Sequence, residues 1–123
     1  MEKLVREILL RNELINLVGR DSNNNTKIYL LHAPDDTVGP YIEYEIIDEN
    51  GSLYAEDKEI VTRYRLQIDI FTKGSYEAIR DKVKEILKEY KNFSKEFGGS
   101  TYEEDTKLFH YILRYNIEKE SEE

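Results

Sequence analysis

The sequence predicts an α+β domain in which a mostly antiparallel β-sheet is covered on one face by two helices. Residues 3–18 and 76–91 place apolar side chains at helical spacing. Residues 59–72 and 107–118 instead alternate between apolar and polar side chains with a period of two. Packing two helices on one face of a sheet would bury both helical apolar stripes and one side of the strands.

Length and composition favour a single domain. A chain of 123 residues buries roughly two thirds of the surface that it exposes when unfolded. We expect one domain over residues 1–118 and an acidic, disordered tail over residues 119–123. The chain has no cysteine, which excludes disulfides and cysteine-based zinc sites and fits a reducing compartment. No apolar run approaches the ~20 residues of a membrane span, so we expect no membrane contact.

The first part of the chain reads as a helix followed by a short strand. The apolar stripe over residues 3–18 predicts one helix, and Gly19 is a natural residue at which it would end. Residues 27–32 form a short apolar run that is typical of a strand. Pro34 and the pair Gly39-Pro40 then require a non-helical loop.

Two strands make up the middle of the chain. Residues 41–48 and 59–72 each alternate, so each is predicted to have a core side and a polar side. Asn50-Gly51 is the strongest turn signal in the sequence. We therefore expect a loop over residues 49–58, too long for a tight hairpin, with an unusually apolar tip at Leu53-Tyr54.

The last part of the chain adds a helix and two strands. Ser75 is a good N-cap for a helix over residues 76–91. Residues 93–102 could extend that helix, but Gly98-Gly99 and poor helix formers favour a short irregular strand. Residues 107–118 alternate with apolar side chains on both faces, which predicts a strand inside the sheet.

No constellation of catalytic or metal-binding residues stands out. The two histidines, His32 and His110, fall on different predicted strands, and their spacing to acidic residues is not that of a metal site. No serine, histidine and aspartate form a recognisable nucleophile arrangement. We therefore expect no enzymatic activity, no cofactor and no metal ion.

Candidate contact residues lie on the polar side of the sheet and at the loop tip. Two arginines of the long strand are expected beside the acidic Glu43 and Glu45 of its neighbour, and to neutralise these and Asp69 across strands. This mixed surface is either a solvated face or a face that meets another copy of the chain. The apolar loop tip either folds back onto the sheet or binds a partner. The candidate interface residues are Leu53, Tyr54, Arg63 and Arg65.

The net charge of the chain indicates whether it is suited to bind nucleic acid. The formal net charge is −8, whereas a protein that grips DNA or RNA needs a basic footprint. We therefore expect no sequence-specific nucleic-acid binding. An acidic surface is compatible with lining a passage for DNA, because like charges do not adhere.

Short signatures follow one another along nearly the whole chain. In order they are Leu17-Val18-Gly19, Ile28-Tyr29, Ala33-Pro34, Pro40-Tyr41-Ile42-Glu43-Tyr44, the strand residues 65–71, Ser75-Tyr76-Glu77-Ala78 and residues 102–110. Their order and spacing resemble the small tail-completion proteins of long-tailed phages and prophages, which are related in role to tail terminators. Leu30, where a proline often follows the Ile-Tyr pair, and the asparagine run 23–25 depart from that pattern.

The resemblance implies a structural virion protein. Proteins of this type cap the tail tube as a ring, usually a hexamer, and present a surface to the head connector. The implied partners are the tail tube protein, connector or neck proteins and further copies of the chain, with DNA passing through the lumen. The implied location is the tail or neck of the virion, after assembly in the host cytoplasm. Two alternatives stay open: another neck or head-closure protein, and an intracellular protein-binding module unrelated to phages.

Overall fold

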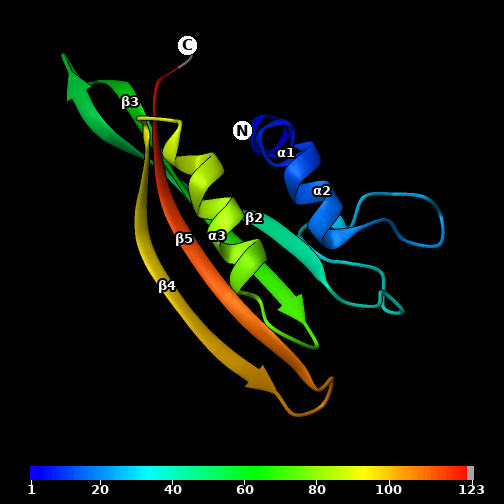
Figure 1. Ribbon diagram of the computed structural model, residues 1–123. Helices are drawn as coiled ribbons and strands as arrows, with labels where there is room; N and C mark the ends of the chain where they lie inside the picture. Colours follow the sequence, from blue (N-terminus) through cyan, green and yellow to red (C-terminus); the bar gives the residue numbers. More distant parts are fainter. Residues whose placement is uncertain (122–123) are drawn as a thin grey trace.

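The computed structural model describes residues 1–121 as a five-stranded sheet with three helices on one face (Figure 1). The strands lie in the order β1-β2-β3-β5-β4. Only the β1–β2 pair is parallel, and the other neighbours are antiparallel. The helices are α1 (Glu2–Leu9), α2 (Asn12–Val18) and α3 (Glu77–Lys88); the strands are β1 (Ile28–Leu30), β2 (Tyr41–Ala55), β3 (Lys58–Thr72), β4 (Phe93–Glu103) and β5 (Leu108–Glu120).

The predicted α+β class is confirmed, but the number of helices is wrong. The single helix expected over residues 3–18 is divided into α1 and α2 by Leu10 and Arg11. Arg11 has an extended backbone, with φ −109° and ψ 146°. Its guanidinium donates hydrogen bonds of 2.9–3.0 Å to the Glu89 carboxylate and the Tyr90 hydroxyl just after α3. The break is thus held by a contact far away in the sequence.

Strands β2 and β3 form one long hairpin, so the loop expected over residues 49–58 is wrong. The turn is Glu56-Asp57, whose φ angles of 52° and 63° are both positive, as a type I′ hairpin turn requires. The predicted turn at Asn50-Gly51 lies inside β2, next to irregularities in the β2–β3 register. The end of this hairpin projects beyond the body of the molecule (Figure 1), and we call residues 51–60 the hairpin arm.

The core lies between the sheet and the helices. Leu9 and Leu14 from the helices pack in one cluster with Ile68 of β3 and Leu113 of β5, and all four are fully buried. The opposite side of the sheet carries no helix, and we call it the open face. No helix within residues 1–121 is long and apolar enough to cross a membrane.

The C-terminal strands end the sheet. Residues 93–103 are strand β4, so the strand assignment holds over a helix extension. Strand β5 runs to Glu120, and the backbone N–H of Ser121 donates to the Ile60 carbonyl at 3.0 Å. The first residues of the expected tail are therefore part of the sheet. Glu122 and Glu123 lie outside the described residues.

Candidate functional site

Four ring side chains cross the open face in one row from β1 to β5. Strand alternation and register bring Tyr41, Phe71 and His110 side by side. Ring centroids are 6.5 Å apart for Tyr29 and Tyr41, 4.8 Å for Tyr41 and Phe71, and 4.2 Å for Phe71 and His110. Burial in this row, together with the charges of two nearby glutamates, raises the pKa of Tyr41 to about 12.

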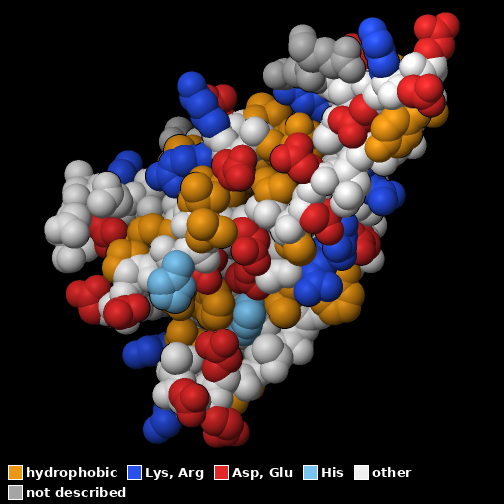
Figure 2. Space-filling model, turned by 180° about the vertical axis from the view of Figure 1, so that it is seen from behind, with side chains coloured by type: hydrophobic (Ala, Val, Ile, Leu, Met, Phe, Trp, Pro, Cys, Tyr) orange, Lys and Arg blue, Asp and Glu red, His pale blue; other side chains and the backbone are white. Residues whose placement is uncertain are grey.

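Two acidic side chains are paired across strands next to this row. Glu43 and Asp69 are register partners on β2 and β3, and their side chains are only 12% and 10% exposed. Figure 2 shows the open face, on which both histidines lie beside acidic side chains. Burying two carboxylates side by side is unfavourable unless each has its own hydrogen-bond donors.

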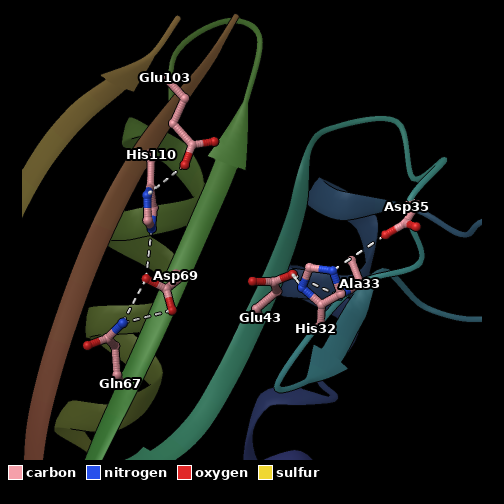
Figure 3. Close-up of polar contacts among 8 residues, drawn as sticks. All are labelled: His32, Ala33, Asp35, Glu43, Gln67, Asp69, Glu103 and His110. Carbon is pink, nitrogen blue, oxygen red and sulfur yellow. Dashed lines mark hydrogen bonds and ion pairs between the residues drawn. The ribbon is translucent and has the colours of Figure 1, made fainter. Parts of the chain in front are cut away.

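Each carboxylate has such donors, and they lie on opposite sides of the pair (Figure 3). Glu43 Oε2 accepts from the backbone N–H of Ala33 at 2.7 Å and lies 3.5 Å from His32 Nδ1. On the other side, Asp69 Oδ1 lies 2.7 Å from His110 Nε2, and both Asp69 oxygens accept from Gln67 Nε2 at 3.1 Å.

The arginines expected to neutralise these acids contact other groups. Arg65 binds Asp48 at 3.0 Å and Glu96 at 3.3 Å. Arg63 lies on the same face, is exposed and has Glu118 as its register partner. The prediction that these two side chains neutralise Glu43 and Asp69 is therefore wrong. Histidine and backbone donors serve the buried pair instead.

The sequence carries one local signal for the buried pair. Asp69 lies between Ile68 and Ile70 in a strand that is otherwise rich in apolar residues. The histidine that contacts it is 41 residues away and is brought there only by the β3–β5 register. Within residues 1–121, no group of three or more acidic, histidine or cysteine side chains could hold a metal ion. The cluster therefore consists of two sets of contacts, one that joins the loop after β1 to Glu43 of β2 and one that joins Asp69 of β3 to His110 of β5.

The predicted interface residues are spread along the hairpin. Leu53 and Tyr54 lie on the hairpin arm and are 51% and 60% exposed. The Tyr54 ring lies over Gly51, where a Cβ atom would collide with the tyrosine hydroxyl. A hydrophobic patch is visible on the arm in Figure 2, at the upper right. Arg63 lies at the base of the arm, opposite Asn50, whereas Arg65 is held in its two ion pairs.

A second surface feature was not predicted. Helix α3 and the edge strand β4 leave between them a groove of about 480 Å³. Its apolar lining comes from Leu87 of α3, Phe93 of β4 and Tyr115 of β5. Its charged lining residues are Asp81, Lys84, Glu85, Lys88 and Lys95. The groove depends on how far α3 extends across the sheet (Figure 1), which no local sequence pattern specifies.

Comparison with known proteins identifies the family of this chain. Residues 3–118 match the family described as tail completion protein gp17. The chain belongs to this family. The resemblance to tail-completion proteins is therefore confirmed, and this tail-completion protein has a structural role in the tail of a virion. That role supports the expectation of a protein without enzymatic activity.

One solved structure with a similar fold comes from a phage-like particle. It is described as the virion of a native gene transfer agent particle, and the similarity covers 96% of this chain and 92% of that chain. The TM-score is 0.64 and the sequence identity is 12%. At this identity, the likeness shows that the fold is shared. No curated protein matches the tail-completion chain.

Proposed function

We propose that this tail-completion protein caps the end of the tail tube as a ring of identical subunits, and joins the tail to the head connector. Family membership supplies the tail role, and the projecting hairpin arm is the observation that supports the assembly step. The arm presents Leu53 and Tyr54, each half exposed or more, and an aromatic side chain on a projecting element is the kind of residue that anchors a protein interface.

A ring requires two different surfaces on each subunit, one for each neighbour. The hairpin arm is one such surface. The remaining surface offers the open face and the α3–β4 groove as separate regions for other contacts. In this proposal the partners are further copies of the chain, the tail tube protein and the connector.

 The hexamer is the expected ring size, and DNA would pass through its lumen, where a net charge of −8 per chain disfavours adhesion to the phosphate backbone.

Electron microscopy of particles produced with and without the gene tests this function. We expect particles lacking the protein to separate into DNA-filled heads and unjoined tails, or to carry tails of uncontrolled length. Intact virions of normal tail length in the absence of the gene would refute the proposal.

The arm itself is tested by Tyr54→Asp. Because the Tyr54 side chain is 60% exposed, its loss costs the fold little, and the thermal melt should stay close to that of the unaltered protein. Assembly onto tail tubes should fail, because a charge replaces an apolar contact. Val38→Asp is the matched control, since Val38 is 65% exposed and lies in the loop before β2. Loss of folding in Tyr54→Asp would show instead that the arm is part of the core.

A further inference from the structure

We propose that the hairpin arm of one copy binds in the groove between α3 and β4 of the next copy, and that this contact closes the ring. The inference rests on the proposed function, in that it names the surface that receives the arm. The charges and apolar side chains of the two surfaces support it.

The arm combines apolar side chains with an acidic tip. Leu53, Tyr54 and Ile60 are its exposed large apolar residues. The turn that follows, Glu56-Asp57, is exposed, and both of its residues have positive φ angles. Within residues 1–121, no lysine, arginine or histidine lies within ion-pair distance of these two carboxylates. Lys58 follows directly, but Glu59 offsets its charge, so the tip remains acidic.

The groove has the complementary chemistry. Its apolar lining is formed by Leu87, Phe93 and Tyr115, and three lysines line it as well: Lys84, Lys88 and Lys95. In the described part of the chain, none of these three lysines forms an ion pair. The groove is therefore an apolar surface with unpaired positive charge around it.

The two acidic residues of the groove do not cancel this charge. Asp81 binds the Arg80 guanidinium at 2.9 Å, and Glu85 binds the Lys82 ammonium at 3.2 Å. Each is thus paired with a cation that does not line the groove. An acidic tip that approaches the groove meets the free lysines, and such complementary charges steer association and set its register.

The size of the groove fits the arm. A volume of about 480 Å³ lies within the range of roughly 300–1,000 Å³ of pockets that hold drug-sized molecules. A tyrosine and a leucine side chain together are about as large as such a molecule. Burial of an aromatic anchor in a groove surrounded by polar groups is the usual form of an interface hot spot.

The contact joins two copies rather than one chain to itself. The arm projects beyond the body of the molecule (Figure 1), so both surfaces are exposed in a single copy. Because the arm and the groove are different surfaces, the contact is heterologous and repeats from one subunit to the next, which closes a ring when the rotation allows it.

Paired charge reversals test the contact. The arm variant is Glu56→Lys with Asp57→Lys, and the groove variant is Lys84→Glu with Lys88→Glu. We expect each variant alone to lower ring formation about tenfold or more, because like charges then face each other, and the combination of both to restore most of it. Lys73→Glu with Lys107→Glu is the control, since both lysines are exposed and neither lines the groove. Thermal melts establish that every variant folds.

Cross-linking gives a second readout that does not depend on charge. The chain has no cysteine, so Ala55→Cys on the arm and Lys88→Cys in the groove introduce the only thiols. After addition of a mild chemical oxidant that takes up the two electrons and two protons of each thiol pair, a chain with both substitutions should form a disulfide-linked ladder of subunits on isolated tails, whereas either substitution alone should not. Absence of the ladder, or full assembly by the groove variant, would overturn the inference.

These outcomes separate the inference from the proposed function. If the gene is required for joined virions but the groove variant assembles normally, the arm binds a different partner and only the inference falls. If virions form normally without the gene, the proposed function falls, and the cross-linking of purified protein still decides whether the arm binds the groove.

Discussion

Replacing Asp69 by alanine probes the buried acidic pair on the open face. The Asp69 carboxylate accepts hydrogen bonds from His110 at 2.7 Å and from Gln67 at 3.1 Å. A hydrogen bond to a charged group contributes about 1.5–3 kcal/mol to the free energy of unfolding. The substitution also leaves the two donors without this acceptor in a site from which water is largely excluded.

Repulsion between two carboxylates acts in the opposite direction, so the sign of the change in unfolding free energy shows which effect is larger. Asp69 has Glu43 as its cross-strand partner, and like charges directly opposite each other destabilise a sheet by up to about 1 kcal/mol. Removing Asp69 relieves that repulsion. Since the lost hydrogen bonds are worth more, we expect Asp69→Ala to lower the free energy of unfolding by about 2 kcal/mol. Asp69→Asn keeps one acceptor oxygen and should cost about half as much.

Urea denaturation followed by circular dichroism measures this change. With a slope of about 1–3 kcal/mol per molar urea, the Asp69→Ala midpoint should fall by about 1 M. Asp35→Ala serves as the control, because the Asp35 side chain is fully exposed, and its midpoint should not move. A midpoint for Asp69→Ala equal to or above that of the unaltered protein would show that repulsion outweighs the hydrogen bonds, and would refute the reasoning.

Two further predictions concern the core and alkaline pH. Ile68→Asp places an unpaired charge at a fully buried position of β3 and should cost several kcal/mol; a thermal melt close to that of the unaltered protein would show that Ile68 does not face the core. Tyr41 has a pKa of about 12 in the folded protein, against about 10 when unfolded. The unfolded chain therefore loses its phenolic proton first, and stability should fall as the pH rises from about 10 toward 12. Burial also raises the pKa of Tyr115. In urea denaturation, Tyr41→Phe should therefore reduce the dependence of the unfolding free energy on pH without abolishing it. An unchanged dependence on pH would contradict the raised pKa of Tyr41.

The strands were predictable because their pattern is local. Alternation over residues 59–72 placed Leu66, Ile68 and Ile70 on the core side, and all three are fully buried. The same reasoning identified residues 93–102 as a strand, because Gly98 and Gly99 are poor residues for a helix. The alternation of side chains and the backbone preferences of single residues can be recognised without knowing the rest of the fold.

The helix break and the hairpin turn were not predictable in this way. No glycine or proline marks Leu10 and Arg11, and the break depends on contacts of Arg11 with residues after α3. Asn50-Gly51 has the stronger turn preference, yet the chain turns at Glu56-Asp57. The pairing of β2 with β3 over the whole arm overrides the local signal.

The same distinction between local pattern and tertiary contact applies to the surface features. Leu53 and Tyr54 are apolar residues in a polar segment, and this property is visible in the sequence. The contact between Asp69 and His110 and the groove beside α3 arise only from strand register and helix placement. Neither has a signature of fixed spacing along the chain.

The continuity of β3 gives the arm a mechanical role. The strand is 15 residues long, about 50 Å at roughly 3.3 Å per residue, and it runs without interruption from the tip of the arm to the middle of the sheet. A force applied to the arm is therefore transmitted along the backbone to the centre of the subunit. There it is resisted in shear by the hydrogen bonds to β2 and β5 together. A ring joined through such arms would share tension among the interiors of its subunits, so that its strength would be that of folded sheets and not that of flexible loops.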